Sequence, residues 1–332
     1  MNSNQQVDYS AGIASACKRI FGAEVAVENP RQLTAGASAA TWLFDVRIGA
    51  ELLPKIAQLF TGEHQFPASL NKQTQGEVQQ AAFAAGVATP RVDGFFVPKD
   101  GVGEGFITEF KKGETLGHRI VKESGLAQAR IVMTGQCGDI LARIHAIPVN
   151  QVPALPSEPT RNMVLALRNT HDLYQQRLPV FEVAFRWLEE NAPQIETPRL
   201  VHGDFRNGNF IVDQSGIVSV LDWEAAHLGD PMEDLGWLCM NAWRFGQIDK
   251  PVGGFGDRAE LYSAYTAASG IVVDPDRVRF WEVFGTLKWG VICQWFAHQF
   301  ESGEVRTLER AAVGHRVSEV ELDILDLLQE VM

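Results

Sequence analysis

The sequence predicts an α+β fold in which a small, sheet-bearing part of the chain precedes a larger, mainly helical part. In the first third, apolar residues alternate or form short runs, as in strands. After about residue 113 they recur at steps of three and four, as on one face of a helix. The chain has 332 residues, 45% of them apolar, which is enough for two lobes with buried cores. We expect lobes over residues 1–110 and 111–332, with a ligand cleft between them.

Short apolar segments and one helix are expected in the first lobe. Residues 41–48 alternate loosely between apolar and polar, and residues 95–97 and 105–110 are shorter apolar runs. Between the first two of these, residues 74–85 have the spacing of a helix that ends at Gly86.

Longer helices are expected in the second lobe. Residues 126–147 form one helix that Pro148 stops, and residues 163–188 form another with a break at Pro179. Two later sets of apolar residues recur at helical steps, and they are Phe284, Leu287, Val291 and Trp295, followed by Val317, Val320, Ile324, Leu327 and Val331.

The overall composition argues against several classes of function. With 41 acidic and 29 basic residues, the formal net charge of −12 repels nucleic acid and anionic membranes. The four cysteines lie far apart without metal-ligand spacing, so we expect them to be reduced and packed. The polar N-terminus lacks signal-peptide features, and no long apolar run occurs. We therefore expect a cytoplasmic protein that binds neither nucleic acid nor a membrane. Its oligomeric state is not readable from the sequence, and a monomer or homodimer is assumed.

A β-hairpin is predicted in the segment that holds most of the candidate functional residues. Two β-rich runs, 210–212 and 217–221, flank the turn signal of residues 213–216. The two strands are therefore expected to pair across a four-residue turn.

The predicted hairpin brings two oxygen-bearing side chains together. The turn is expected to place Val212 opposite Ile217. By strand register, Asn209 then faces Val220, and Asp222 projects from the same face. Asn209 and Asp222 become diagonal neighbours roughly 7–8 Å apart by backbone. An amide oxygen and a carboxylate suit Mg²⁺, with phosphate oxygens and water completing its shell, whereas zinc prefers His and Cys.

Asp204 is the candidate catalytic base. It lies five residues before Asn209, in a loop that contains glycine and asparagine. A carboxylate near a metal-bound phosphate can accept a hydroxyl proton and orient the attacking oxygen. A catalytic Asp, an Asn five residues later and a second Asp after a hairpin match a known kinase template.

Four short motifs within this segment are His202-Gly203-Asp204, Asn209, Asp222-Trp223-Glu224 and Gly229-Asp230-Pro231. Together they resemble the aminoglycoside phosphotransferase and choline kinase family. The resemblance implies a bilobal, protein-kinase-like fold, with a small antiparallel-sheet lobe for the nucleotide and a larger, mainly helical lobe for catalysis and substrate binding. It implies ATP as cofactor, Asp204 as catalytic base, Asn209 and Asp222 as Mg²⁺ ligands, and His202 as a support of the loop. The run that starts at Asp230 is typical of a helix N-cap, so we expect Asp230 to be structural.

The resemblance extends into the first lobe. Gly36, Ala37 and Ser38 occupy the place of the phosphate-covering loop, where backbone amides can cradle phosphates. Glu109 and Phe110 lie in a segment similar to the hinge between the lobes, where backbone groups are implied to contact the adenine.

The basic residue that holds the α- and β-phosphates has two candidate positions. Lys55 lies at a suitable distance after the loop, although Pro54 disturbs the strand. The apolar run that follows could place Gln58 there instead. Glu77, on the predicted helix, is the expected ion-pair partner of Lys55. Without a cation at this place, the protein would bind nucleotide weakly or be inactive.

The sequence thus predicts an ATP- and Mg²⁺-dependent phosphotransferase that acts on a hydroxyl group of a small molecule. A catalytically weak or inactive nucleotide-binding protein of the same fold is the alternative. A metal-dependent hydrolase would need His202 as a ligand, without a second His or Cys nearby. Aminoglycosides, choline-like alcohols, homoserine-like metabolites and sugars all remain candidate acceptors. The acids Glu224, Glu233 and Asp234 either hold a cationic substrate group or brace the loops.

Overall fold

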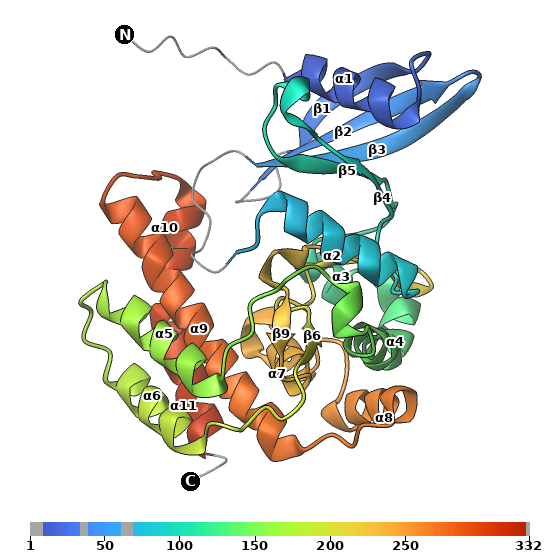
Figure 1. Ribbon diagram of the computed structural model, residues 1–332. Helices are drawn as coiled ribbons and strands as arrows, with labels where there is room; N and C mark the ends of the chain where they lie inside the picture. The colour runs from blue at the N-terminus through green and yellow to red at the C-terminus, as the bar shows by residue number, and fades with distance from the viewer. Residues whose placement is uncertain (1–8, 34–38, 61–68, 330–332) are drawn as a thin grey trace.

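A five-stranded sheet lies at one end of the molecule and a set of helices at the other (Figure 1). The structure is a computed structural model and describes residues 9–33, 39–60 and 69–329. The first part of the chain forms the sheet, and the rest forms most of the helices. The predicted α+β fold, with a small sheet-bearing lobe before a larger helical lobe, is therefore confirmed.

The sheet of the N-terminal lobe has the strand order β1-β2-β3-β5-β4. Every neighbouring pair in it is antiparallel. The predicted segments 41–48 and 105–110 correspond to β2 and β5, whereas 95–97 overlaps β4 only at Phe95. The strands are β1 (Ala26–Leu33), β2 (Ala39–Ile48), β3 (Glu51–Phe60), β4 (Val92–Phe95) and β5 (Gly105–Glu109).

One face of this sheet is covered by helix α1 (Tyr9–Phe21), which the sequence patterns above did not predict. Ala57 and Leu59 of β3 share a buried core with Ile13 of α1. Because side chains alternate along a strand, Lys55 points to this same face. The α1 side of the sheet is therefore a packed interior.

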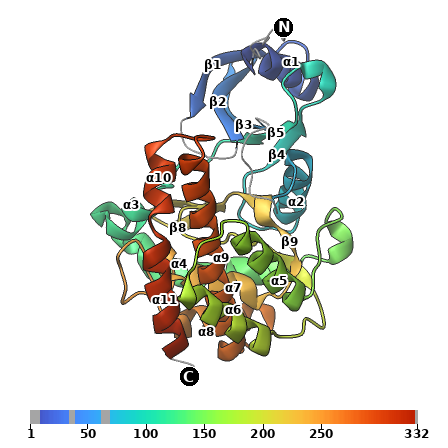
Figure 2. The same cartoon turned by 90° about the vertical axis from the view of Figure 1, so that its left-hand side faces the viewer.

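The opposite face of the sheet meets helix α2 (Lys72–Ala84). Gln58 and Phe106 are direct partners in the β3–β5 ladder, so both point to this face. Phe106 and Phe95 pack where α2 carries Gly76, and a Cβ at Gly76 would lie only 2.4 Å from a ring carbon of Phe95. Figures 1 and 2 both show α2 between the sheet and the helices of the other lobe.

Helix α2 belongs to the larger core as much as to the sheet. Its start is fixed by Asn71, whose side chain accepts a hydrogen bond of 2.8 Å from a backbone N–H of the first turn. Val78 and Ala82 are buried in the apolar cluster that fills the C-terminal lobe. The helix predicted over 74–85 is confirmed, and it begins directly after the cap.

The C-terminal lobe is mainly helical, as predicted. Its helices are α3 (Gly117–Lys122), α4 (Ala127–His145), α5 (Thr160–Asp172), α6 (Pro179–Asn191), α7 (Met232–Cys239), α8 (Arg258–Ser269), α9 (Pro275–Glu301), α10 (Leu308–Gly314) and α11 (Val317–Gln329). The long helix α9 packs against α5, α6, α7, α10 and α11. The predicted break at Pro179 separates α5 from α6, because the proline occupies the first turn of α6.

Two small antiparallel sheets in the C-terminal lobe frame one loop. Strand β6 (Arg199–Val201) pairs with β9 (His227–Gly229), and β7 (Phe210–Asp213) pairs with β8 (Gly216–Val220). The loop 202–209 connects the first strand of one pair to the first strand of the other. Both ends of this loop are thus anchored in sheet.

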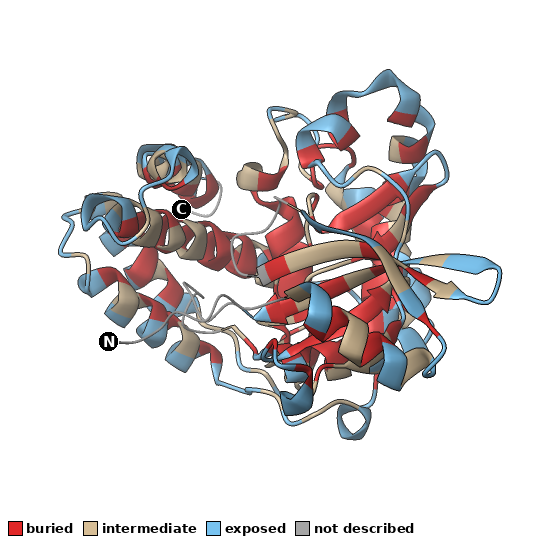
Figure 3. Cartoon of the chain, turned by 90° about the horizontal axis from the view of Figure 1, so that it is seen from above, coloured by how far each residue is buried: buried red, intermediate tan, exposed pale blue. Residues whose placement is uncertain are grey.

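Buried residues follow the sheet and the inward faces of the helices (Figure 3). The four cysteines are buried and free, as expected from their spacing. Within residues 9–33, 39–60 and 69–329, no helix is both long enough and apolar enough to cross a membrane.

Candidate active site

The hairpin β7–β8 forms with a different register from the predicted one. Val212 lies opposite Ile217, as expected. A bulge between Ile211 and Val212 then shifts the ladder, so Val220 faces Phe210 instead of Asn209. The carbonyl of Asn209 instead accepts a hydrogen bond of 2.8 Å from the N–H of Leu221, directly after β8.

Asp222 reaches the site through a turn and not through strand alternation. Its backbone has φ 65°, in the left-handed region that Asp tolerates better than most residues. Burial raises the pKa of its carboxyl group to about 7, and the charges of Glu224 and Asp204 act in the same direction. The cations Lys72 and Arg206 oppose them. Asp222 is therefore a buried carboxyl group among both acidic and basic neighbours.

The carboxylate of Asp204 is held by three side-chain donors. The Nε of Arg206 and the Nε1 of Trp237 donate to Oδ1 over 2.9 Å and 2.8 Å. The Nδ2 of Asn209 donates to Oδ2 over 2.6 Å. The side chain of Asp204 nevertheless keeps 19% of its surface exposed. It is thus fixed in orientation and still accessible from the solvent.

Asp234, at the start of α7, anchors the loop that carries Asp204. Its two carboxylate oxygens accept the backbone N–H groups of His202 and Gly203 over 2.8 Å and 2.9 Å. Burial alone would raise the pKa of Asp234, but a hydrogen bond and the charge of His145 hold it below its usual value. His145 also contacts Tyr265 over 2.9 Å. Loop-bracing was one of the two roles expected of Asp234, but its partners could not be predicted, because they lie far apart along the chain.

His202 connects the loop to the segment that precedes Asp222. Its Nδ1 accepts the N–H of Asp204 over 3.2 Å, so Nε2 carries the proton and donates to the carbonyl of Leu221 over 3.1 Å. Burial lowers the pKa of this imidazole, which favours the same neutral form. These contacts are those of a structural support.

The acids around the start of α7 are occupied by structural contacts. Asp230 accepts the N–H of Met232 over 3.0 Å and hydrogen bonds from the side chains of Arg277 and Trp281. Glu233 pairs with the imidazole of His227 over 3.1 Å. Of the acids considered for a cationic substrate group, Glu233 and Asp234 therefore brace the fold.

The residues expected to hold Mg²⁺ present suitable oxygen atoms. Asn209 uses its amide nitrogen on Asp204, which leaves Oδ1 as its remaining ligand atom. Asp222 offers a carboxylate close enough to Asp204 for their charges to interact. Among the described residues, no group of three or more His, Cys, Asp and Glu side chains is placed to hold a metal alone. The donor set therefore suits a hard cation that receives further oxygen ligands from a nucleotide and water.

The predicted nucleotide-binding residues of the N-terminal lobe have different outcomes. Gly36, Ala37 and Ser38 lie outside the described residues. The N–H of Glu109 donates to the carbonyl of Arg91 over 3.0 Å, and that of Phe110 donates to the carbonyl of Pro54 over 3.3 Å. Both backbone donors of the expected hinge are thus engaged within the protein, and the adenine contact there stays a prediction.

The predicted ion pair between Lys55 and Glu77 is wrong. The Nζ of Lys55 lies 2.7 Å from a carboxylate oxygen of Asp93 and 5.2 Å from the ring centre of Phe21 in α1. Glu77 instead accepts a hydrogen bond of 2.8 Å from Gln73 on its own helix. Strand alternation explains the error, since Lys55 points to the α1 face and Gln58 to the opposite one.

A second buried lysine lies next to the site. Lys72 is the first residue of α2 and is 1% exposed. Its Nζ donates to the side-chain oxygen of Gln75 over 2.8 Å. Burial lowers its pKa, whereas the carboxylates of Asp222 and Glu224 act to raise it. Lys72 was not among the predicted site residues, although its place directly after Asn71, a residue type that caps helices, was a visible signal.

Aromatic rings and cations border Asp204. Trp237, which donates to Asp204, forms an aromatic group with Trp243 and Trp289, with ring centres 5.6 Å and 5.2 Å apart. The guanidinium carbon of Arg206 lies 4.4 Å from the ring centre of Trp243, and the Nζ of Lys288 lies 5.0 Å from that of Trp237. The surroundings of Asp204 on this side are aromatic and basic.

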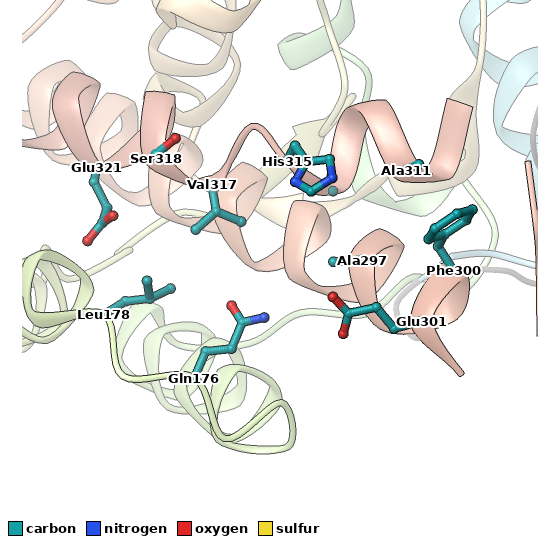
Figure 4. Close-up of a pocket in the computed structure, with 11 residues that line it drawn as sticks. Gln176, Leu178, Ala297, Phe300, Glu301, Ala311, His315, Val317, Ser318 and Glu321 are labelled. Carbon is teal, nitrogen blue, oxygen red and sulfur yellow. The ribbon is translucent and has the colours of Figure 1, made fainter. Parts of the chain in front are cut away.

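A pocket of about 330 Å³ lies elsewhere, among α9, α10, α11 and the segment before α6 (Figure 4). Gln176, His315 and Glu321 are among the residues that line it. None of the residues predicted for catalysis, metal binding or nucleotide binding lines this pocket.

Comparison with known sequences gives a match over most of the chain. The profile of the phosphotransferase enzyme family matches residues 31–281. Acyl-CoA dehydrogenase family member 10 from Mus musculus is 38% identical over 65 residues, which cover 19% of this chain and 6% of that protein. Acyl-CoA dehydrogenase family member 11 from Homo sapiens is 25% identical over 171 residues, or 48% and 21% of the two. The match thus spans a small part of these curated relatives.

Solved structures share the whole fold. A protein from Ralstonia eutropha, described as a candidate aminoglycoside phosphotransferase, has a TM-score of 0.77 at 18% identity, covering 96% of this chain and 98% of that one. Choline kinase from Cryptosporidium parvum has a TM-score of 0.63 at 15% identity, with 96% of each covered. An aminoglycoside phosphotransferase in ternary complex with AMP-PNP and hygromycin B has a TM-score of 0.61 at 16% identity, with 94% and 98% covered. The predicted bilobal, protein-kinase-like fold is confirmed.

Proposed function

Because the chain belongs to the phosphotransferase enzyme family, we propose that it is a small-molecule kinase that transfers a phosphoryl group from ATP to a hydroxyl group, with Mg²⁺ as cofactor. The observation that carries this proposal is the arrangement of Asp204, Asn209 and Asp222. Asp204 and Asn209 are hydrogen bonded over 2.6 Å, and the charge of Asp204 acts on Asp222. One carboxylate thus lies next to an oxygen set for a hard cation.

In this proposal Asp204 is the residue that handles the proton. Three donors fix its carboxylate, so it can orient an acceptor hydroxyl and accept its proton during transfer. Asn209 and Asp222 would hold Mg²⁺, which neutralises phosphate charge when it is bound. Asp234 keeps the loop in place through the N–H groups of His202 and Gly203.

We infer that the acceptor is neutral or anionic and not a polycation. Arg206 is paired with Asp204, so Lys288, stacked on Trp237, supplies the remaining positive charge on this side. Glu233 and Asp234, which could have bound a cationic group, are engaged with His227 and the loop. A polycationic aminoglycoside would therefore meet like charge at the place where its hydroxyl must approach.

An assay of Mg²⁺-dependent ADP release tests the activity. The panel contains hydroxy acids, phosphorylated sugars, neutral sugars, choline and aminoglycosides. We expect release with a neutral or anionic compound and its loss with EDTA. Asp204→Asn should lower turnover by about 10²–10⁴-fold and leave Mg-ATP binding in place. Asp213→Asn, in the exposed hairpin turn, is the matched control and should keep turnover.

The outcomes separate the parts of this proposal. Turnover that survives in Asp204→Asn would remove Asp204 as the base. Release with choline or aminoglycosides alone would contradict the inferred charge of the acceptor.

A catalytically weak nucleotide-binding protein of the same fold is the second candidate. It is favoured by Lys55, which points to the α1 face and pairs with Asp93. In that case Mg-ATP would raise the melting temperature by ligand linkage, while no compound of the panel would give a phosphorylated product.

A further inference from the structure

The α2-side face of strand β3 carries no lysine or arginine in the described residues. Lys55 lies on the α1 face, where Asp93 and Phe21 contact it. The opposite face carries Ile56 and Gln58. Phe106, the ladder partner of Gln58, faces α2. A nucleotide bound between the lobes would therefore receive no positive charge from this strand.

Lys72 is a buried cation whose hydrogen-bond partner is neutral. Its Nζ donates to the amide oxygen of Gln75, and the amide nitrogen of Gln75 donates to the carbonyl of Leu70 over 2.8 Å. Among the described carboxylates, none forms an ion pair with Lys72. An ammonium group held out of water without an opposite charge in contact is costly, so such a group usually has a charged partner in the functional state.

The place of Lys72 is the contact between α2 and the segment that carries Asp222. The N–H of Leu70 donates to the carbonyl of Glu224 over 2.8 Å. Helix α2 packs against the short turn of helix at Trp223–Ala225, which follows Asp222 directly. The start of α2 is therefore tied to the same segment as the expected Mg²⁺ ligand.

We propose that Lys72 contacts the phosphates of the bound nucleotide and takes the place of a lysine on β3. This inference rests on the proposed function and adds the residue that completes its phosphate site. The carboxylates of Asp222 and Glu224 act on Lys72 only through their charge, and a polyphosphate beside Asp222 would add an anionic group in direct contact with Nζ. Lys55 then has a structural role only.

A chemical label on the wild-type protein tests the position of Lys72 directly. The probe is an acyl phosphate of ATP, whose mixed anhydride passes its acyl group to an amine near the phosphates. The neutral lysine nitrogen attacks the acyl carbon and forms an amide, its proton passes to water, the bond from that carbon to the phosphate oxygen breaks, and ATP leaves. We expect mass spectrometry of the digest to find the label on Lys72, reduced by excess Mg-ATP. A label on Lys55 in its place would overturn the proposal.

Binding measurements on variants give a second test. We expect Lys72→Met to weaken Mg-ATP binding by about tenfold or more and to leave adenosine binding unchanged, which also shows that the variant is folded. Lys72→Arg keeps the charge and should recover most of the affinity. Lys55→Met, the matched control, should bind Mg-ATP within about twofold of the wild type.

The outcomes of the binding test are distinct. Absence of Mg-ATP binding by the wild type would remove the proposed function and this inference together. Mg-ATP binding that is equal in the wild type and Lys72→Met would remove only the role of Lys72. Tighter binding of Mg²⁺ by Lys72→Met would show that the lysine instead competes with the metal, which also overturns the proposal.

Discussion

The buried carboxylates of the C-terminal lobe and the buried ion pair of the N-terminal lobe are held in different ways. Asp234 is bound to backbone N–H groups of the loop that carries Asp204, so its charge fixes main-chain geometry at the candidate site. Asp93 is bound to the side chains of Lys55 and Arg91 on the α1 side of the sheet. One arrangement shapes the loop, whereas the other neutralises charges within packed strands.

The partners of a buried charge therefore indicate its role better than its residue type does. Lys55 has the residue type expected of a phosphate ligand, but its partners are Asp93 and Phe21. Lys72 has a neutral partner, Gln75, and a place beside Asp222. Substitutions in the two lobes should therefore separate effects on activity from effects on stability.

The largest expected effect is that of Asp234→Asn. The two carboxylate oxygens of Asp234 each accept a hydrogen bond from a backbone N–H group. In asparagine an NH₂ group would replace one of these oxygens and face a second donor, and the buried charge would be lost. We expect the free energy of unfolding to fall by about 3–5 kcal/mol and turnover to fall at least 100-fold. Chemical denaturation and the ADP-release assay measure the two effects. Normal turnover in a stable variant would show that the loop does not depend on this anchor.

Lys55→Met should affect stability alone. The buried carboxylate of Asp93 keeps Arg91 at 2.8 Å but loses Lys55, so we expect a loss of about 1–3 kcal/mol in the free energy of unfolding. Turnover of the folded variant should stay within about twofold of the wild type. Lys99→Met, at an exposed position of the same lobe, is the control and should change neither quantity. A large fall in turnover with unchanged stability would restore Lys55 to the phosphate site.

The smallest expected effect concerns His227 and its pH dependence. Burial alone would lower the pKa of His227 and Lys288 acts in the same direction, but the carboxylate of Glu233 outweighs them and raises it. The pair therefore adds stability below the usual histidine pKa of about 6.5, and this stability is lost as the pH rises through the higher folded-state value. His227→Gln should lower the melting temperature by about 2–4 °C more at pH 5.5 than at pH 8.5. An equal decrease at both pH values would contradict the charged pair.

The sequence was informative where chemistry and chain proximity coincide. Asp204, Asn209 and Asp222 lie within one short segment around a hairpin, and the described contacts bring Asp204 to Asn209 and its charge close to Asp222. The bulge between Ile211 and Val212 was not predictable, because no glycine or proline marks it. The shift of one residue was enough to exchange the predicted partner of Val220.

Other features were hidden because they depend on distant contacts. Asp234 and His145 are 89 residues apart along the chain and meet only in the fold. The face to which Lys55 points depends on how side chains alternate along β3. Pro54 and the residues after Lys55 did not settle that alternation from the sequence. The place of Lys72 depended on how α2 docks against the turn after Asp222.

Helix α2 also sets a limit on how the protein can be divided. Its sequence position assigns it to the first 110 residues, yet Val78 and Ala82 fill the interior of the second lobe. A fragment that starts at residue 111 would lack these side chains, and the apolar surface that they now cover would be exposed to water. Such a fragment would aggregate. A fragment that starts just before Leu70 would retain α2 and keep this surface buried.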